Sequence, residues 1–347
     1  MKICFLSGPN KPGKCGISDY IKLLISEFEK YNSQCRHIAI DEECTLSDIA
    51  QNLPDADMYS VQFAPYAFSP TGLSKKELSD FAKSLKGRNT HINFHEIWIG
   101  AYPNATWKEK MVGWRQKKEI LNFLKIANPN AVTCSNAAVI DRLSNTGVDA
   151  NYLYLCGGIP YAENNKNRCS KVLQIAFFGT LYETFPYDIL AKTINQISLF
   201  LKRSIQINVL GRTRESTGFN QLMDVSQKYG LNISILGELP SDVISKEFQM
   251  SDIGICTTPF DIIGKSSTTA TMLEHRLPVL AFDDGDTPKS KLFVMNEFID
   301  QVFLLNDDST VARMISFLQK PRKQFFDGVA HTAKKMLKIS KNQYAQI

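Results

Sequence analysis

The sequence of 347 residues lacks several features that would narrow its class at once. Its eight cysteines are scattered, with no C-x-x-C pair and no histidine cluster beside them, so neither a zinc site nor a disulfide framework is indicated. No apolar run is long enough to span a bilayer, and the run from Met1 to Ser7 is too short for the core of a signal peptide. We therefore expect a cytoplasmic protein with reduced thiols.

The sequence also has no strong charge bias and no low-complexity tract. Lysine and arginine number 40 against 35 for aspartate and glutamate, an excess of five that does not by itself indicate a nucleic-acid partner. The apolar content of 44% and the charged content of 22% are typical of a soluble globular protein. The length suits two domains, each able to bury its own core.

What the sequence does contain is a regular alternation of short apolar runs with longer amphipathic stretches. This pattern is typical of α/β proteins in which helices cover both faces of a parallel sheet. In the first half we expect strands at 3–6, 35–40, 58–63, 91–95, 131–134 and 152–155, and helices at 17–31, 74–85, 108–127 and 136–143. In the second half we expect strands at 173–178, 205–210, 233–236, 253–257, 279–282 and 302–305, and helices at 188–201, 220–229, 241–250, 268–275 and 310–318.

The two series are separated by the polar, unpatterned stretch 161–170, which is the expected linker. We predict one doubly wound, Rossmann-like domain at 1–165 and a second at 170–320, with a basic helix at about 321–347 that packs back on the first domain. Ligands of open parallel sheets bind beyond the carboxyl ends of the strands. The residues at the strand ends are therefore the candidate binding residues.

One of these strand ends has the composition of an anion site. Residues 259–280 lead from a polar turn through a helix into a buried strand. The N–H groups of a first helical turn have no partner inside the helix, and Lys265 adds a full positive charge beside them. Further donors come from Ser266, Ser267 and Thr268. We expect a nucleoside diphosphate here, the alternative being that these hydroxyl residues are simple N-caps.

Five segments occur in a familiar order along residues 1–285: CGISDY at 15–20, QFAPYAF at 62–68, FHEIWIG at 94–100, FFGTL at 177–181, and GKSSTTATMLEHRLPV at 264–279. Together they resemble a two-domain GT-B glycosyltransferase of the family 4 kind, and in particular a bacterial subgroup with FHEIWIG and GKSxxxxxMLEHxLPV motifs. The order and spread of the matches are far more specific than any single glycine motif.

The resemblance implies the GT-B fold, with two doubly wound domains facing each other across a cleft. It also implies transfer of a sugar from a nucleotide diphosphate donor, bound by the second domain, to an acceptor bound by the first. A UDP-sugar is expected, with UDP-glucose favoured because it is common in the family, and the acceptor is a polysaccharide, an oligosaccharide or a lipid-linked glycan. Such enzymes usually retain the anomeric configuration and need no metal or other cofactor.

The catalytic candidates lie in the FHEIWIG segment. In the family, the histidine of this loop contacts the donor sugar near its reacting face, and His95 occupies that position. Glu96 is a candidate base on the acceptor side. The alternatives are a structural histidine and a carboxylate that serves as its hydrogen-bonding partner.

The donor-binding candidates are spread over several strand ends. Gly16 and Gly179 are positions where a missing side chain allows close approach of the backbone, and Thr180 follows the second of them. Arg212 and Lys265 are the cations available for a diphosphate. The alternative for Arg212 is a surface ion pair with Glu215 or Glu238.

This sequence departs from the common family pattern in the donor-site helix. Ile263 and Thr271 stand where family 4 commonly has the two glutamates of its E-x7-E motif, and Glu274 lies one helical turn beyond. Thr271 and Glu274 remain donor-site candidates. The absent glutamates leave open a noncatalytic nucleotide-sugar-binding or scaffold protein of the same fold.

Two further patterns have simpler explanations than a metal site or a dinucleotide site. The D-x-D pattern within 283–286 follows a predicted strand and is expected to be an ordinary turn, so no metal site is predicted. The glycine loop at 8–16 lacks G-x-G-x-x-G, which argues against a dinucleotide-binding oxidoreductase.

The stretch from Trp107 to Lys118 mixes aromatic and basic residues on a predicted helix. Such a helix suits peripheral contact with an anionic bilayer at the inner face of the membrane. The alternative, which the pattern favours somewhat, is a basic solvent-facing surface with Trp and Met turned toward the core.

Overall fold

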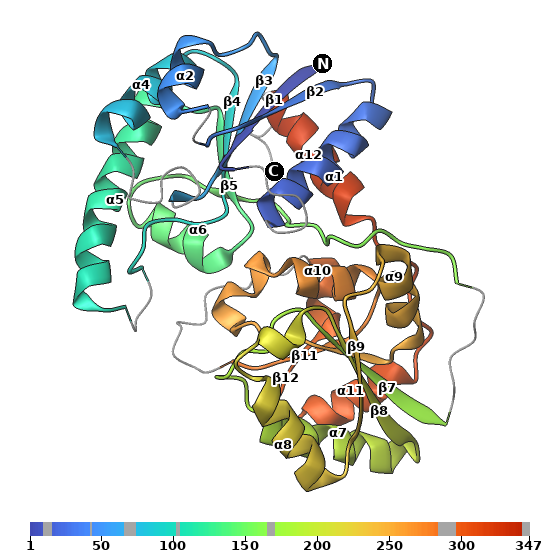
Figure 1. Cartoon of the computed structure of the whole chain (residues 1–347). Coiled ribbons are helices and arrows are strands. Elements are labelled where there is room, and N and C mark those ends of the chain that lie inside the picture. Colours follow the sequence, from blue (N-terminus) through green and yellow to red (C-terminus); the bar gives the residue numbers. More distant parts are fainter. Residues whose placement is uncertain are drawn as a thin grey trace. The chain divides into compact units, whose positions relative to one another are not determined.

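The computed structural model describes residues 1–9, 16–41, 44–65, 74–101, 105–164, 171–283 and 296–341. The described residues divide into two compact units (Figure 1). Of the described residues, those within 1–155 and 329–341 form the first domain, and those within 156–283 and 296–328 form the second. The boundaries predicted at residues 165 and 170 fall on 165–170, which lie outside the described residues.

The first domain is built on a six-stranded parallel sheet with the strand order β2-β1-β3-β4-β5-β6. Its strands are β1 (Lys2–Ser7), β2 (Gln34–Ala39), β3 (Met58–Phe63), β4 (Thr90–Phe94), β5 (Ala131–Cys134) and β6 (Asn151–Tyr152). The helices between them are α1 (Gly16–Lys30), α2 (Leu46–Gln51), α4 (Lys75–Leu85), α5 (Trp107–Ala127) and α6 (Ala137–Ser144).

One face of this sheet is covered by α2, α4 and α5, whose apolar sides form a continuous core with it. The rings of Phe81 on α4 and Phe123 on α5 stack with centroids 5.8 Å apart, and Phe63 of β3 packs 5.7 Å from Phe123. Full burial of such a ring contributes about 1.5 to 3 kcal/mol. Helix α5 begins at a capping box, in which Thr106 and Glu109 satisfy each other's backbone N–H groups.

The other face carries α1, whose Phe28 ring lies 6.0 Å from the ring of Phe5 in β1. The last described helix, α12 (Gly328–Ser340), is held to the same domain. Its Thr332 hydroxyl donates to the carbonyl oxygen of Tyr154 at 3.0 Å, and its Lys335 ammonium donates to that of Tyr152 at 2.6 Å.

Helix α12 starts later than the sequence predicts, at Gly328 instead of residue 321. The segment before it is held in a non-helical conformation by tertiary contacts. The Phe325 ring packs 5.1 Å from the His275 ring, and the Phe326 N–H donates to the Glu274 carbonyl at 2.9 Å. The Arg322 guanidinium donates to carbonyl oxygens at the end of helix α9 (Ser241–Met250), those of Phe248, Gln249 and Ser251.

The second domain has its own six-stranded parallel sheet, with the order β12-β11-β10-β7-β8-β9. Its strands are β7 (Val172–Phe178), β8 (Ser204–Leu210), β9 (Asn232–Gly237), β10 (Ile253–Ile255), β11 (Val279–Ala281) and β12 (Val302–Leu304). The helices are α7 (Tyr187–Leu201), α8 (Phe219–Tyr229), α9 (Ser241–Met250), α10 (Ser267–Glu274) and α11 (Thr310–Leu318).

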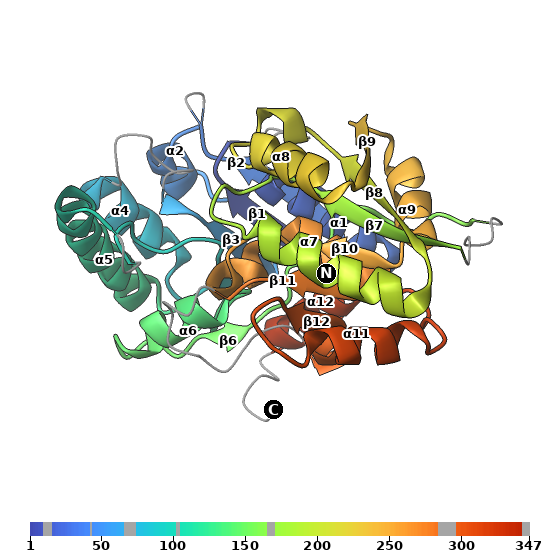
Figure 2. The same ribbon diagram turned by 90° about the horizontal axis from the view of Figure 1, so that it is seen from below.

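Helices cover both faces of the second sheet. Figure 2 shows α7 and α11 side by side on one face, where Ile194 and Met314 join the core. On the other face Phe248 of α9 packs edge-on against Phe178 of β7, with centroids 5.3 Å apart. Both domains therefore have the doubly wound α/β architecture that the alternating sequence pattern predicts.

Candidate functional site

The carboxyl edge of the second sheet is a row of glycine turns joined by backbone hydrogen bonds. Gly179, Gly211 and Gly237 stand at the ends of β7, β8 and β9 and all have positive φ, at 95°, 91° and 69°. The Gly211 N–H donates to the Gly237 carbonyl at 2.7 Å, and the Gly179 N–H donates to the Leu210 carbonyl at 3.3 Å. Glycine adopts this backbone region without the steric cost that a Cβ atom brings.

Gly179 also lies against the start of α10. A Cβ atom at this position would come within 2.8 Å of the Thr268 Cγ2 atom. The turn after β7 and the first turn of α10 are therefore in contact only because residue 179 has no side chain. Thr180, the next residue, is fixed from a third loop, because the Thr257 hydroxyl donates to its carbonyl oxygen at 2.5 Å.

The first turn of α10 is organised around the Ser266 hydroxyl. Ser266 is the N-cap, and its Oγ accepts from the Thr269 N–H at 3.2 Å and from the Thr269 hydroxyl at 2.8 Å. The Thr258 hydroxyl donates to the same oxygen, and the Thr268 hydroxyl lies 3.0 Å from it. Ser266 is thus the N-cap that the simpler alternative predicts, and the N–H groups of Ser267 and Thr268 have no acceptor inside the helix.

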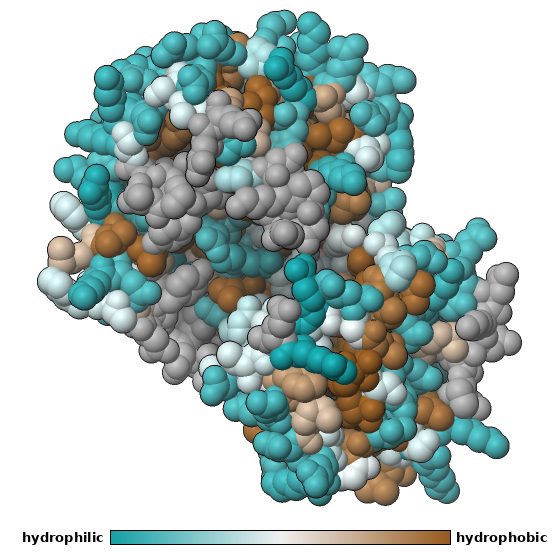
Figure 3. All heavy atoms as spheres, in the orientation of Figure 1, coloured by the Kyte–Doolittle hydropathy of each residue, from teal (hydrophilic) through white to brown (hydrophobic). Residues whose placement is uncertain are grey.

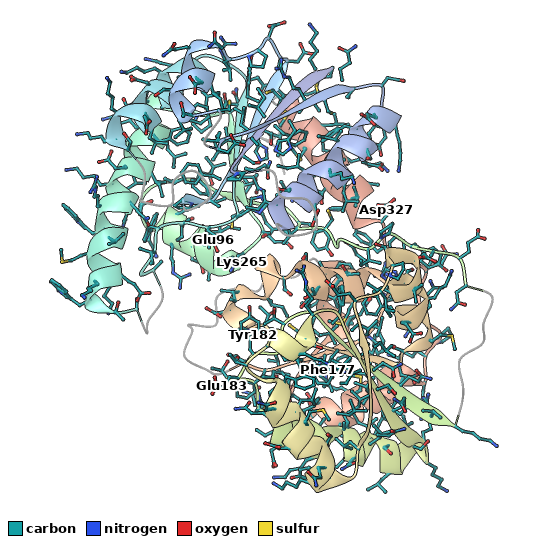
Figure 4. All side chains as sticks on the ribbon, viewed as in Figure 1. Glu96, Phe177, Tyr182, Glu183, Lys265 and Asp327 are labelled. Atoms are coloured by element: carbon teal, nitrogen blue, oxygen red, sulfur yellow. The ribbon has the colours of Figure 1, made fainter. Side chains whose placement is uncertain are left out.

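The two candidate cations lie on the same edge. Lys265 ends the 3-10 helix Phe260–Lys265 immediately before α10, as Figure 4 shows. Arg212 follows Gly211, and its Nε is 2.8 Å from the Glu238 Oε1 atom, both side chains being more than half exposed. The ion pair with Glu238 is one of the two that the sequence offers as alternatives, and the side chain of Glu215 lies outside the described residues. An exposed pair of this kind contributes about 0 to 1 kcal/mol, so an anionic ligand can compete for the guanidinium.

Thr271 and Glu274 lie further along α10 and hold a segment of the chain itself. The Gly157 N–H donates to the Glu274 carboxylate at 2.9 Å, and the Gly158 N–H donates to the Thr271 hydroxyl at 3.0 Å. A Cβ atom at Gly157 would lie 2.6 Å from the Thr271 Oγ1 atom and 2.7 Å from a Glu274 oxygen. Burial, followed by the charge of Glu274, raises the pKa of the neighbouring Cys156 thiol.

His275 of the same motif is a buried structural histidine. Its Nδ1 lies 2.8 Å from the Thr271 carbonyl oxygen and its Nε2 lies 2.8 Å from the Ser245 hydroxyl. The carbonyl can only accept, so Nδ1 carries the proton and Nε2 accepts from Ser245. Burial lowers the pKa of His275 to about 4, and the neutral ring therefore persists at neutral pH.

In the first domain, His95 is attached to a closed ring of hydrogen bonds between side chains of β3, β4 and β5. The Gln62 amide donates to the Ser60 hydroxyl at 2.8 Å, and this hydroxyl lies 3.1 Å from the His91 Nδ1 atom. On the far side, the His91 Nε2 atom lies 2.7 Å from the Thr133 hydroxyl. The Thr133 hydroxyl donates to Asn93 at 2.9 Å, and the Asn93 amide donates back to the Gln62 Oε1 atom at 3.0 Å.

This ring determines the proton position on His91 and favours one on His95. The Thr133 hydroxyl uses its proton on Asn93, so it accepts from His91 Nε2–H, and His91 Nδ1 accepts from Ser60. Outside the ring, His95 Nε2 lies 2.8 Å from the Gln62 Oε1 atom, which only accepts. The bond to the Gln62 oxygen favours the tautomer of His95 that carries its proton on Nε2, and the Asn93 amide nitrogen lies 3.3 Å from the same atom.

Burial keeps His91 neutral. This residue is fully buried, and burial lowers its pKa to about 3, while a positive charge on His95 would lower it further. His95 is 9% exposed at the end of β4, and the Tyr20 ring of α1 meets it edge-on at 5.5 Å. Glu96, labelled in Figure 4, is exposed beside it.

The remaining candidates are less constrained by the structure. Gly16 is the first residue of α1, and a Cβ atom there would meet nothing within 4 Å. The predicted D-x-D turn is described only at Asp283, since 284–286 lie outside the described residues. Within the described ranges, no three His, Cys, Asp or Glu side chains gather as metal ligands would. The absence of a metal requirement stays a prediction.

Sequence reasoning missed several residues of this edge. Thr257 and Thr258 were placed at or beyond the end of a strand without a role, and Gly237 was not recognised as a third glycine turn. A strand followed by glycine recurs at β7, β8 and β9, and this repetition was the available signal. The polar partners Ser60, Asn93 and Thr133 alternate with apolar residues along their strands, which predicts a shared face but not which side chains bond.

No protein-family model and no curated protein matches the sequence. Solved structures do resemble it. HepE from Anabaena in complex with UDP is 14% identical, with a TM-score of 0.55 over 99% of this chain and 97% of that one. HepE has also been solved with UDP-glucose.

Two other solved structures have a similar fold. A glycosyltransferase from Rickettsia africae is 13% identical, with a TM-score of 0.55 over 100% and 99% of the two chains. A putative UDP-N-acetylglucosamine 2-epimerase from Listeria monocytogenes is 9% identical, with a TM-score of 0.51 over 100% and 97%. At these identities the likeness shows the fold alone: the chain has the GT-B fold, with two Rossmann-like domains in tandem.

Proposed function

We propose that the protein is a glycosyltransferase that moves a sugar from a nucleoside diphosphate donor, with UDP-glucose favoured, to a glycan or lipid-linked acceptor. The observation that carries the proposal is the meeting of the Gly179 turn with the first turn of α10, beside Lys265. Backbone N–H groups, hydroxyls and a lysine at a helix start are the groups that bind a diphosphate. The fold agrees, since HepE, which shares it, binds UDP-glucose.

In this proposal Lys265 and Arg212 neutralise the diphosphate, and Gly179, Thr180, Ser266, Ser267 and Thr268 line it. Thr271 and Glu274 act indirectly, because their polar atoms hold Gly157 and Gly158 against α10. His95 and Glu96 serve the sugar and the acceptor from the first domain. Gly16 lets the backbone of the α1 start approach the donor.

Transfer proceeds with retention and without a metal. The bond between the anomeric carbon and the phosphate oxygen breaks, and the acceptor hydroxyl oxygen bonds to the same face of that carbon. The acceptor proton passes to the leaving phosphate oxygen. Placement of the reactants and stabilisation of the charge that develops on the leaving group supply most of the rate.

The fold alone does not choose among reactions, because a putative epimerase shares it. Incubation with a panel of nucleotide sugars distinguishes the outcomes. Slow release of free nucleotide, accelerated by an acceptor glycan, supports transfer. Conversion of the sugar to its C2 epimer would show an epimerase, and saturable binding without either reaction would show the noncatalytic binding protein.

A further inference from the structure

The first half of α5 turns its largest apolar side chains to solvent. Trp107 is 72% exposed, Met111 54% and Trp114 69%. The expectation that Trp and Met face the core is therefore wrong. The reason is close packing on the inner side of the helix, where Gly113 is buried and a Cβ atom in its place would lie 1.8 Å from the Ile99 carbonyl oxygen.

These side chains form one stripe with Lys118. Residues 107, 111, 114 and 118 are spaced by four, three and four positions, which places them in one line along an α-helix. The Lys118 ammonium lies 5.8 Å from the centre of the Trp114 ring. Figure 3 shows apolar and intermediate residues at the surface over the first turns of α5, at the left edge of the view.

Basic residues flank the stripe on both sides. At 100° per residue, Lys108 and Arg115 fall on one side of it and Lys110 and Lys117 on the other. Between Trp107 and Lys118 the five basic residues exceed the single acidic one, Glu109, by four. Glu109 projects away from the stripe and is engaged in the capping box, where its carboxylate accepts from the Thr106 N–H at 2.7 Å.

We propose that this surface, called here the α5 surface, docks on an anionic phospholipid bilayer. Tryptophan has an apolar ring with one polar N–H, a combination that favours the boundary between headgroups and acyl chains. The exposed groups of Lys108, Lys110, Arg115 and Lys118 are placed to meet lipid phosphates at that level, whereas the Lys117 ammonium lies 5.2 Å from the centre of the buried Trp98 ring. Among the described residues no helix has the length and hydropathy to cross a bilayer. The contact is therefore peripheral.

A membrane fits the α5 surface better than a protein partner does. The stripe lies on the outermost line of a single helix, opposite the side that packs on the core, so it offers a convex edge that a planar bilayer boundary can accept. Charges of one sign on both flanks match the uniform negative surface of such a bilayer. The proposal goes beyond glycosyl transfer and is independent of it.

The test is co-sedimentation of the full chain with vesicles of phosphatidylcholine, with and without phosphatidylglycerol. We expect binding only to the anionic vesicles, weakened by salt. Binding should also shift the tryptophan emission to the blue, since two of the three tryptophans lie in the α5 surface and the third, Trp98, is already buried.

Two paired variants separate the contributions of the rings and the charges. Lys110→Glu with Lys118→Glu should weaken binding by at least about 30-fold, because two attractive charges of about 1 kcal/mol each are lost and the two new carboxylates are repelled by the anionic surface. Trp107→Ala with Trp114→Ala should weaken it by about tenfold or more. The matched control for charge is Lys75→Glu with Lys76→Glu, exposed residues on α4 of the same domain, and the control for apolar area is Leu199→Ala with Phe200→Ala on α7.

Three results would overturn the proposal. The first is absence of binding to anionic vesicles, and the second is equal binding to neutral ones. The third is a change of oligomeric state on Trp107→Ala with Trp114→Ala, measured by sedimentation without lipid, which would assign the α5 surface to a second copy of the chain. None of these measurements uses turnover, so they leave the proposed function untouched.

Discussion

The two domains use polar side chains in opposite ways. In the first domain Gln62, His91 and their neighbours bond to one another in a closed ring, beneath the surface of the sheet. In the second domain the hydroxyl and cationic groups near α10 lie at a strand edge, half-exposed, around a helix start. The first arrangement fixes the orientation of one histidine, whereas the second can exchange its contacts for those of an anion.

The most direct test of anion binding at the start of α10 is Lys265→Ala. We expect turnover with a nucleotide sugar to fall by about 100- to 1000-fold while the fold is unchanged, because in the proposed function the ammonium offsets charge on the leaving diphosphate. Lys246→Ala is the control, since this exposed lysine of the same domain pairs with Asp242 on α9. Unchanged kinetics in the Lys265 variant would remove this residue from the site.

Acid should destabilise both domains through their buried histidines. The pKa of His91 is lowered to about 3 and that of His275 to about 4, both below the ordinary value of 6.5. As the pH falls below 6.5, these two histidines become protonated in the unfolded chain but stay neutral in the folded protein. Each histidine thus contributes stability that is present above pH 6.5 and is lost progressively on the way down to its folded pKa.

Between pH 7 and pH 5 each of these histidines should cost about 2 kcal/mol in the free energy of unfolding. Urea titrations at several pH values measure this loss. His275→Gln should make the free energy of unfolding of the second domain less dependent on pH. The pH dependence of the first domain should be unchanged. A pH-independent midpoint in the wild type would contradict the buried, neutral assignment.

The closed ring can be opened at one point with Thr133→Val. This change leaves His91 Nε2–H and the Asn93 carbonyl without their partner, at a cost of about 2 to 4 kcal/mol in the free energy of unfolding. Thr332→Val is the matched control, because the Thr332 hydroxyl donates a single bond, to the Tyr154 carbonyl, and should cost about 1 kcal/mol. Equal losses would mean that the ring has no stabilising effect beyond a single bond.

The smallest expected effect concerns the glycine turns. Gly179→Ala meets both a positive φ and the Thr268 methyl group, and should cost about 1 to 3 kcal/mol. Gly16→Ala, at an unobstructed helix start, should be neutral or slightly stabilising. Thermal unfolding of the two variants measures the difference in their loss of stability. Equal stability of the two variants would mean that the turn after β7 can move away from α10.

Much of the fold follows from the sequence pattern. Every predicted strand has a counterpart in the structure, and β3 and β5 coincide with the predictions at 58–63 and 131–134. Short apolar runs bounded by polar residues define buried parallel strands well because helices cover both faces and most positions on them are apolar. The sequence pattern does not predict helix α2. Only six residues form it, which is less than two helical turns and too short for a recognisable apolar period.

The errors come from contacts between distant residues. No local pattern reveals that Arg322 and Phe325 hold the chain in a non-helical conformation before Gly328, because their partners lie far away in sequence. Likewise, no local pattern reveals that the Glu274 carboxylate accepts from the Gly157 N–H, and the role of Glu274 in donor binding stays a prediction. Residue type and spacing identify candidate groups, whereas the partner of a buried polar group depends on tertiary packing.

The closed ring beneath His95 has a further consequence for protonation chemistry. Its hydrogen bonds all run in one sense, so the opposite sense requires both amides to flip, both hydroxyls to rotate and the proton of His91 to change nitrogen at once. His95 cannot move its own proton from Nε2 without losing its bond to the Gln62 oxygen. The ring and the Gln62 oxygen therefore favour one tautomeric form of the His95 imidazole, selected by side chains of three strands rather than by the solvent.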